Sequence, residues 1–497
     1  MTKYHKYISL MLFCLVFCVG VVLSPRSGVS WDEPDNIFAG GIFVTFFKEG
    51  FRPHAFDGFW QQRSYFRDRI FTLDPTLSHY PPLANYVGSL FTLVSEQFGY
   101  GKSGPQIIVL FHVATALFFA LLVAHVYNIA ILMELTPITA LFVALATYLY
   151  PTMFGHGLTN LKDTAQAAMF TWAMYFLVRG SLVRGAVVWG LALATKFNAV
   201  YVPIIWGIWK IRSIRGIKKL LVILVVGFAT AFLVWPYLWF NTIAHVGEVV
   251  TYFTTVGQGY HVYWYGHLYT VGERSTLWWY PWMSILTMTP PILLLLGGIG
   301  AMKLLREKDK KRKLLLLWFF VPMARTILPY AAFYDGLRHF MEVIPAMMLL
   351  CGVGVEAISR RLYPVILGGI VGYLILINVS YFPYSTGYVN MFVSNPNINL
   401  DRDIEGLSVK EGIDWLHQAY GDVSVWIPIS SHTGWVYVRG GRDQIVRDVS
   451  GASFIIVVNK ASHLRVTDYI STLVSGCTLV HEIRRGTAVF GWVYKKN

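Results

Sequence analysis

Charged residues are scarce in this chain. Asp, Glu, Lys and Arg make up 14% of its 497 residues, whereas they make up roughly a quarter of an ordinary soluble domain. Apolar residues make up 55%, and the mean hydropathy is +0.51. This composition excludes a soluble globular protein and predicts an integral membrane protein.

Cysteine is also rare. The chain has four cysteines, of which Cys14, Cys18 and Cys351 lie in apolar segments and Cys477 lies alone in a polar C-terminal region. A disulfide bond within that region is therefore excluded. The close cysteine and histidine spacings that are typical of zinc sites are absent as well.

Acidic residues are outnumbered by basic residues, 27 to 41, which gives a formal charge of +14. A basic chain can bind nucleic acid, but in polytopic membrane proteins Lys and Arg usually collect in cytoplasmic loops. Here the basic residues cluster between apolar segments, most densely at residues 210–219 and 303–313. We therefore expect a fixed orientation in the membrane and no nucleic-acid partner.

Long apolar runs are what the sequence has in abundance, and each is long enough, or nearly so, to cross about 30 Å of hydrocarbon. One run lies between Arg184 and Lys210, which are both expected in the cytoplasm. That run must therefore enter and leave the membrane as two short helices, with Lys196 at the outer turn. The pattern predicts an all-α polytopic membrane protein with about 11 crossings and a cytoplasmic N-terminus. The runs cover residues 7–24, 105–127, 135–151, 164–179, 185–209, 220–238, 283–302, 314–332, 339–358 and 362–380.

Two long polar regions are then expected on the outer face. The loop at residues 25–104 follows the first run and is expected to carry juxtamembrane helices. From about residue 397 onward, amphipathic and alternating segments indicate a small soluble α/β domain. We predict a membrane domain at residues 1–380 and an extracytoplasmic segment at residues 381–497. The small domain is expected to be a lid, a scaffold or a docking module for an acceptor.

Three acids lie in "VSWDEPDNIF", directly after the first run. Ser30 or Asp32 can cap a helix that begins at Glu33 or Pro34, but capping explains only one acid. A carboxylate that takes a proton from an alcohol must be ionised and close to it. Asp32 and Glu33 are therefore candidates for general-base work, and Asp35 is expected in an exposed turn.

A second polar cluster lies in the outer loop "GHGLTNLKDTAQAAMF". Asp163 in this loop suits a helix N-terminus, and it is also a second acid at the same aqueous boundary as Asp32. The two interpretations do not exclude each other. His156 and Asn160 lie nearby and are candidates for substrate contacts.

Basic residues lie at the outer ends of several apolar helices. A lone basic residue commonly reaches toward lipid headgroups. Several on one face, opposite acids, suit a bound phosphate, which an Arg can contact through two nitrogens. An anionic lipid headgroup is therefore the expected ligand. The residues concerned are Lys196, Arg274, Arg338 and His339.

Six segments of the chain carry a family resemblance, and they are, in this order, "WDEPDNIF", "HYPPLANYVGSLF", "GHGLTNLKDTAQAAMFTWAMYF", "GLALATKFNAVYVP", "WWYPWMSILTMTPPILLLL" and "YDGLRHFMEVIPAMMLLCGVG". They resemble the protein O-mannosyltransferase and aminoarabinose-transferase type of GT-C glycosyltransferase, glycosyltransferase family 39. They cover nearly the whole membrane portion. The resemblance implies a GT-C fold and a polyprenyl-phosphate sugar as the donor, used outside the cytoplasm.

The resemblance also implies roles for single residues. Asp32 would be the general base in an inverting transfer, with Glu33 as its partner. The departing lipid phosphate needs positive charge, and this role falls to Lys196 and Arg338, with Arg274 and His339 less directly. Further donor or substrate contacts are expected from His79, His156, Asn160 and Asp163. In this family a basic residue often precedes the prolines of "HYPPL", whereas here Tyr80 stands there.

Cofactor, partners and location follow from the same resemblance. No cofactor is certain, but a divalent metal cation would lie between Asp32 and Asp163. The expected partners are a polyprenyl-phosphate-linked sugar, membrane lipid and an acceptor protein, lipid or glycan. The expected location is the inner or plasma membrane of the cell. A transporter or lipid flippase for a lipid-linked or anionic substrate is the alternative function, and an inactive scaffold is a third.

Overall fold

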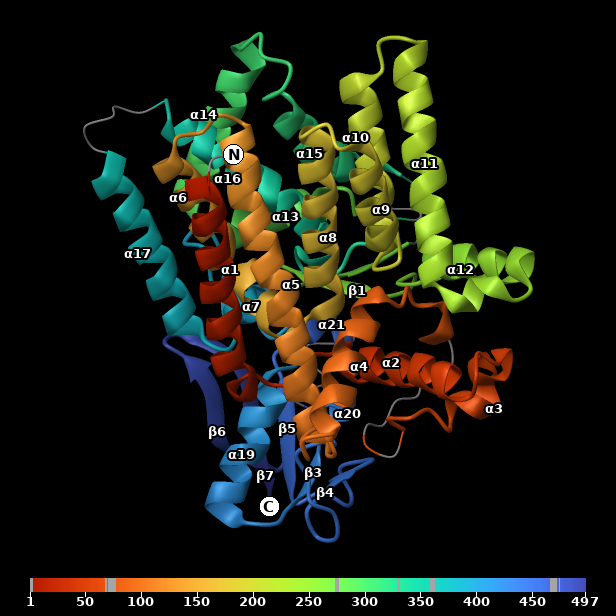
Figure 1. Cartoon of the computed structure of the whole chain (residues 1–497). Coiled ribbons are helices and arrows are strands. Elements are labelled where there is room, and N and C mark those ends of the chain that lie inside the picture. Colours follow the sequence, from red (N-terminus) through yellow and green to blue (C-terminus); the bar gives the residue numbers. More distant parts are fainter. Residues whose placement is uncertain are drawn as a thin grey trace.

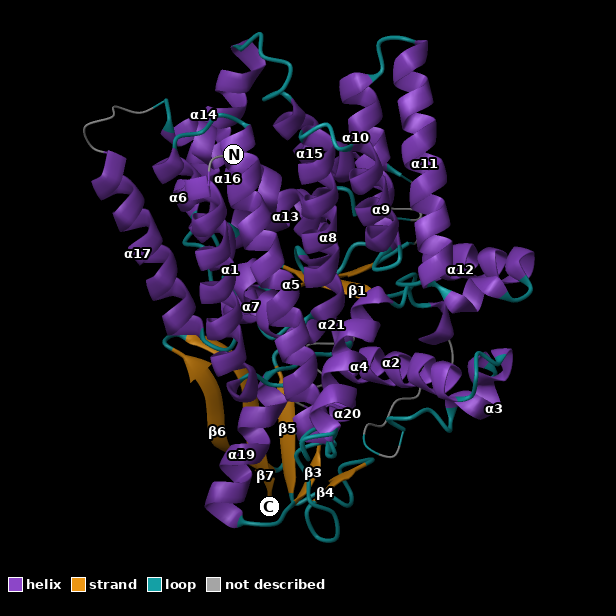
Figure 2. Cartoon of the chain, in the orientation of Figure 1, coloured by secondary structure: helices purple, strands orange, loops and turns teal. Residues whose placement is uncertain are grey.

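Apolar helices dominate the chain and stand side by side as a bundle, with a small sheet-containing domain at one end (Figures 1 and 2). The structure is a computed structural model, and it describes residues 3–67, 69, 77–272, 277–328, 331–357, 363–464, 472 and 474–497. Within this part of the chain, five helices are long and apolar enough to cross a membrane. They comprise α1 (Lys3–Leu23), α5 (Gly104–Leu132), α11 (Ile214–Val234), α16 (Ile344–Val355) with the turn before it, and α17 (Tyr363–Tyr381).

Two bent helix pairs raise the number of possible crossings to seven. One pair is α6 (Pro137–Leu149) with α7 (Pro151–Thr159), bent by 61°, and the other is α13 (Trp279–Met288) with α14 (Pro291–Arg306), bent by 117°. A proline begins the second helix of each pair. It lacks the N–H that a continuous helix would use. The all-α polytopic architecture is confirmed, while the number of about 11 crossings stays a prediction.

Shorter apolar helices fill the rest of the bundle. They are α8 (Leu161–Val178), α9 (Leu182–Leu193), α10 (Tyr201–Lys210) and α15 (Leu314–Met323). The chain breaks between α9 and α10, where the sequence predicts the outer turn. Lys196 lies in this break beside the start of α8, bonded to Asp163. The far end of α10 lies against another loop, where the Trp209 Nε1 donates to the Lys310 carbonyl at 2.9 Å.

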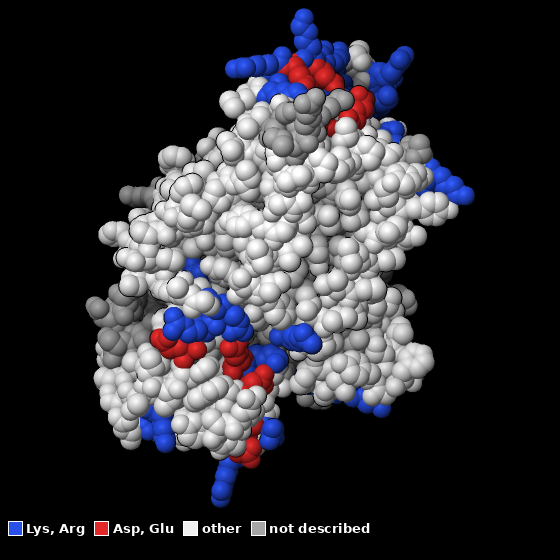
Figure 3. All heavy atoms as spheres, turned by 90° about the vertical axis from the view of Figure 1, so that its left-hand side faces the viewer, with Lys and Arg blue, Asp and Glu red and all other residues white. Residues whose placement is uncertain are grey.

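Basic residues gather at the end of the bundle that is remote from the small domain. Figure 3 shows Lys and Arg there, separated from a lower patch of mixed charge by a broad band with few charged residues. The loop at residues 303–313 lies at this end, where Lys311 pairs with Glu134 at 3.0 Å and Arg312 lies 3.7 Å from Glu356. The gathering of basic residues at one end agrees with the basic clusters in the sequence. Which side is cytoplasmic stays a prediction.

Helix α14 packs closely against the C-terminal half of α16, the helix that follows the candidate site residues Arg338 and His339. A Cβ added at Gly300 would lie 1.9 Å from the Leu350 carbonyl oxygen, and one at Gly354 would lie 2.0 Å from that of Leu296. Small residues let membrane helices approach in this way, because van der Waals contact drives their association. A larger side chain at either glycine would force the two helices apart.

Other helices lie across the bundle rather than along it. Figure 1 shows α2 (Glu33–Lys48) and α12 (Thr242–Thr255) in this orientation, with α12 at the lower end of α11 and α2 nearer to the small domain. The loop at residues 25–104 also contains α4 (Leu83–Glu96), while the expectation that the helices of this loop are juxtamembrane stays a prediction. The short elements of this region are α3 (Gly58–Gln61), β1 (His261–Trp264) and β2 (His267–Thr270).

The small C-terminal α/β domain is present as predicted. Its sheet has five strands in the order β4-β3-β5-β7-β6, parallel among β4, β3 and β5 and antiparallel across β7. Helix α19 (Ser408–Tyr420) buries Ile413 and Leu416 in the core that it shares with the sheet. The strands are β3 (Ser424–Trp426), β4 (Gln444–Val446), β5 (Phe454–Val458), β6 (Cys477–Arg485) and β7 (Ala488–Lys496), and the short helices are α18 (Pro396–Asn399), α20 (Ser431–Gly434) and α21 (Ala461–Leu464).

Candidate functional site

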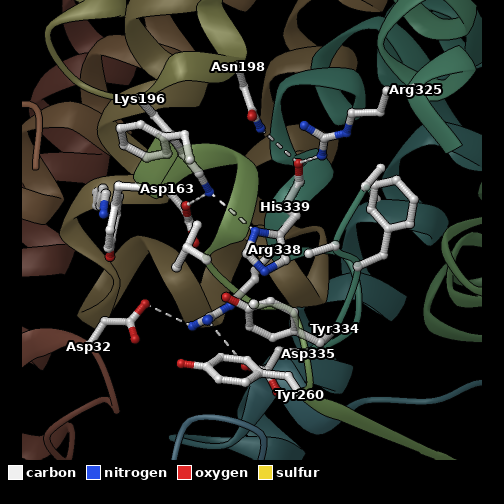
Figure 4. A pocket seen from close by; sticks show the side chains of 18 of the residues that line it. Asp32, Asp163, Lys196, Asn198, Tyr260, Arg325, Tyr334, Asp335, Arg338 and His339 are labelled. Atoms are coloured by element: carbon white, nitrogen blue, oxygen red, sulfur yellow. Dashed lines mark hydrogen bonds and ion pairs between the residues drawn. The ribbon is translucent and has the colours of Figure 1, made fainter. Parts of the chain in front are cut away.

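A cavity of about 460 Å³ lies where the helix bundle meets the C-terminal domain. Its wall is built from segments that are far apart in the sequence, and it is rich in charge (Figure 4). Aromatic and aliphatic side chains, including Phe253, Leu328 and Phe333, line another part of it. The charged and titratable lining residues are Asp32, Asp35, Lys162, Asp163, Lys196, Arg325, Asp335, Arg338, His339 and His463.

Asp32 and Arg338 form an ion pair on the wall of the cavity. Asp32 directly precedes α2, and its side chain is 40% exposed. The Arg338 Nη1 lies 3.0 Å from the Asp32 Oδ2, and its Nη2 lies 3.2 Å from the Asp335 Oδ2. Arg338 itself is 4% exposed. The guanidinium is therefore fixed between two carboxylates, and of the two, the Asp32 carboxylate is the one that solvent reaches.

Lys196 lies deeper in the same cavity. Its ammonium group donates to the Asp163 Oδ1 and lies 3.5 Å from the His339 Nδ1 (Figure 4). Asn160 orients Asp163, because its Nδ2 donates to the Asp163 Oδ2 at 3.0 Å and its Oδ1 accepts from the Asp163 backbone N–H at 3.1 Å. Asn160 is thus the cap of α8 and a support for Asp163. The prediction that Asp163 lies at a helix N-terminus fits this geometry, and its position at the outer boundary of the membrane stays a prediction.

Two further basic residues, Lys162 and Arg325, also line the cavity. They were not among the predicted site residues. The Lys162 Nζ lies 3.5 Å from the centroid of the Tyr80 ring, and the Tyr80 hydroxyl accepts from that of Tyr252 at 2.8 Å. Arg325 donates to the His339 carbonyl oxygen. The sequence does indicate Arg325 in one way, because a charged residue inside an apolar run is often functional. Lys162 stands next to Asp163 in the quoted motif.

The C-terminal domain supplies part of the site. The Lys460 Nζ, 1% exposed, lies 3.0 Å from the Asp335 Oδ1. Burial alone would raise the pKa of Asp335, but the charges of Lys460 and Arg338 outweigh burial and hold that pKa below its usual value. The Trp31 ring centroid lies 4.6 Å from those of His432 and His463. The domain is therefore more than an appended module, and sequence reasoning missed this because the contact joins residues hundreds of positions apart.

Glu33 does not accompany Asp32 on the cavity wall. Its side chain is 2% exposed, the His112 Nε2 lies 2.9 Å from its Oε1, and the Ser30 backbone N–H donates to its Oε2 at 3.1 Å. The geometry therefore favours a structural role for Glu33. Asp35, in contrast, lines the cavity and is only partly exposed. The expectation that Asp35 lies in an exposed turn is wrong, because the first turn of α2 faces the cavity.

Three other predicted residues lie outside the cavity wall or outside the described chain. His79 lies 3.7 Å from Glu248, beside rather than on the wall, and Tyr80 takes the position facing the cavity. His156 is fully buried, with its Nδ1 3.6 Å from the Glu405 Oε1. Arg274 lies outside the described residues.

In the described part of the chain, Asp32 and Asp163 do not form a ligand set for a divalent metal. Asp32 and Asp163 both line the cavity, but each carboxylate is paired with a cation, Arg338 or Lys196. Hard cations take about six oxygen ligands. Within the described part of the chain, no group of three or more His, Cys, Asp or Glu side chains is placed to hold a metal.

Comparisons with known proteins give a likeness of fold. No family model and no curated protein matches the chain. Two solved structures of ArnT from Cupriavidus metallidurans, in the apo state and bound to undecaprenyl phosphate, are 14% and 13% identical to it. Each match covers 99% of this chain and 98% of the other, with TM-scores of 0.46 and 0.47.

An oligosaccharyltransferase from Archaeoglobus fulgidus, solved in complex with zinc and sulfate, is 12% identical. The match covers 97% of this chain and 72% of the other, with a TM-score of 0.46.

Proposed function

We propose that this chain is an integral membrane glycosyltransferase that moves a sugar from a polyprenyl-phosphate donor to an acceptor hydroxyl on the extracytoplasmic face. The observation that carries the proposal is one cavity lined by a partly exposed carboxylate, Asp32, and by two largely buried cations, Lys196 and Arg338. The order of the six sequence motifs supports the same function. In this proposal the N-terminus is cytoplasmic, the C-terminal domain is extracytoplasmic, and the membrane is the inner or plasma membrane.

Asp32 acts as the general base. Arg338 contacts the Oδ2 of Asp32, so the Oδ1 is the atom that takes the proton from the acceptor hydroxyl. The acceptor oxygen then forms a bond to the anomeric carbon of the sugar while the bond from that carbon to the phosphate oxygen breaks. Attack from the face opposite to the departing phosphate inverts the anomeric configuration.

The lysine and arginine side chains stabilise the departing phosphate. Negative charge grows on the phosphate oxygen as the bond breaks, and fixed cations in a water-poor cavity stabilise it more strongly than water does. Lys196 is 13% exposed and Arg338 is 4% exposed. Both side chains have therefore lost most of their hydration before a donor binds. Lys162 lies on the same wall, but burial lowers its pKa to about 7, so it carries only part of a positive charge at neutral pH.

The apolar part of the cavity suits the first isoprene units of the donor. Leu328 lines the cavity and is 51% exposed, and Ile327 beside it is 74% exposed. In a membrane protein, such side chains face lipid. A prenyl chain that leaves the cavity past Leu328 would therefore remain in the hydrocarbon while its phosphate contacts the cations. The acceptor, which is a protein, a lipid or a glycan, enters from the side of the C-terminal domain.

The proposal is tested by Asp32→Asn, assayed in detergent with a polyprenyl-phosphate sugar donor and detection of the transferred sugar by mass spectrometry. We expect the variant to lose activity by about 10²–10⁴-fold, because Asn cannot accept the proton. Asp57→Asn, the same change at an exposed position of the same loop, is the control. Wild-type activity in D32N would contradict the assignment of Asp32. Movement of lipid-linked substrate across vesicles without any transfer would support the transporter alternative.

A further inference from the structure

Glu405 is a buried carboxyl group that the proposed mechanism does not use. It belongs to the C-terminal segment, just before α19, and its side chain is fully buried. Among the residues that the structure describes, neither of its carboxylate oxygens has a hydrogen-bond partner. Burying an ionised carboxylate in this state is very unfavourable, and such groups normally gain a partner or a proton.

Arg338 is the closest cation to Glu405, but it already serves two other acids. The Glu405 Oε1 lies 3.8 Å from the Arg338 Nη1, the same nitrogen that lies 3.0 Å from the Asp32 Oδ2. The second nitrogen, Nη2, faces Asp335, which also pairs with Lys460. With Asp32, Asp335 and Glu405 all ionised, three negative charges would face two positive ones.

A proton on Glu405 removes this imbalance, and the nearest titratable neighbour does not restore the lost compensation through a hydrogen bond. The His156 Nδ1 lies 3.6 Å from the Glu405 Oε1. Burial raises the pKa of Glu405 to about 8, although Arg338 and Lys460 act in the opposite direction and Asp32 and Asp335 act in the same direction as burial. The carboxyl group is then neutral at pH 7, and the Nη1 remains with Asp32.

We propose that Glu405 is a positioning residue that is protonated in the active enzyme and that, when ionised, competes with Asp32 and the donor phosphate for Arg338. This inference rests on the proposed function of Asp32 and Arg338. Ionisation would draw the Nη1 away from Asp32 and place a negative charge beside the departing phosphate. Both effects slow transfer, so activity should fall as the pH rises through the range in which Glu405 loses its proton.

The test is the pH profile of sugar transfer by Glu405→Gln, which has the shape of the protonated acid and cannot ionise. With a pKa of about 8, about one tenth of wild-type molecules keep the proton at pH 9. We therefore expect the ratio of activity at pH 9 to activity at pH 6.5 to be about tenfold higher in E405Q than in the wild type. Glu482→Gln, on the exposed side of β6, makes the same chemical change away from Arg338 and should keep the wild-type profile.

Two results would overturn the inference. One is an E405Q profile that falls at the same pH as the wild type. The other is an E405Q that is folded but inactive at every pH, because this would mean that the charged form is required. A third result separates the two proposals. If D32N keeps wild-type activity while the E405Q profile is shifted as expected, the role of Asp32 is contradicted, and Glu405 is still a group whose ionisation slows transfer.

Thermal unfolding in detergent tests the protonation without any assay of transfer. The unfolded pKa of a Glu is about 4.5 and the folded pKa of Glu405 is about 8, so the folded state binds the extra proton between these values. The stability of the wild type relative to E405Q should therefore be highest below pH 4.5 and should fall as the pH rises to about 8. A difference that does not change with pH would show that Glu405 is already ionised and would contradict the inference, even if no transfer is detected.

Discussion

Single residues divide into those that line the cavity and those that support it. Asp32, Lys196, Arg338 and His339 were candidates from the sequence, and all of them line one cavity. Their positions at the outer ends of apolar runs made this predictable, since the boundary of the membrane brings such residues to one level. Glu33 shows where this reasoning fails, because adjacent residues at the start of a helix point in different directions and only one of them reached the cavity.

Lys196 gives a prediction at this scale. Replacing it by Gln removes a buried positive charge beside the proposed phosphate position, and we expect kcat/KM for sugar transfer to fall by about 10²–10³-fold. Steady-state kinetics with a water-soluble short-chain donor would measure this. Lys210→Gln, at the far end of the same pair of helices, is the matched control and should have little effect. Unchanged kinetics in K196Q would exclude Lys196 from phosphate stabilisation.

At the scale of elements, the pair α9 and α10 decides where Lys196 lies. The charge pattern alone required the run at residues 185–209 to turn back, because both of its flanks are basic. The structure breaks the run at residues 194–200, with Lys196 bonded to Asp163 at the start of α8. A single straight helix would have placed a lysine in hydrocarbon, at a cost of about 2.5–3.5 kcal/mol on insertion scales.

The same pair of helices gives a topological prediction. Phe197, which is 42% exposed, and Arg212 are replaced by Cys, one at a time, in a variant without the four native cysteines. A membrane-impermeant thiol reagent added to intact cells should label the cysteine at position 197 and not the one at 212. Labelling of both positions from the same side would contradict the two-crossing arrangement of α9 and α10.

For the whole molecule, the contact between the helix bundle and the C-terminal domain is decisive. Lys460 and Glu405 come from the domain, while Asp335 and Arg338 come from the bundle, and the four groups form one buried network. Removing one partner of a buried ion pair leaves the other charge without compensation. The domain is therefore expected to be required for an ordered cavity.

Lys460→Met tests this coupling. It leaves Asp335 with Arg338 as its remaining partner, and we expect the free energy of unfolding to fall by about 3 kcal/mol. The double variant K460M/D335N should regain part of this loss, since no unpaired charge remains. Lys410→Met removes an ion pair on the surface of α19 and should cost about 1 kcal/mol or less. Thermal unfolding in detergent measures all three variants, and equal losses in K460M and K410M would contradict the coupling.

The sequence by itself determined the membrane architecture, the turn at Lys196, the α/β domain and most of the candidate charges. These features depend on hydrophobic length, local periodicity and charge between apolar runs, which are properties of continuous segments. The tertiary structure decided which charges share a cavity. It separated Glu33 from Asp32, brought Asp35 and Arg325 to the wall, and supplied Lys460 and Glu405 from the C-terminal domain. Such pairings join positions far apart in the chain, and they are fixed by how helices and domain pack, which no local pattern records.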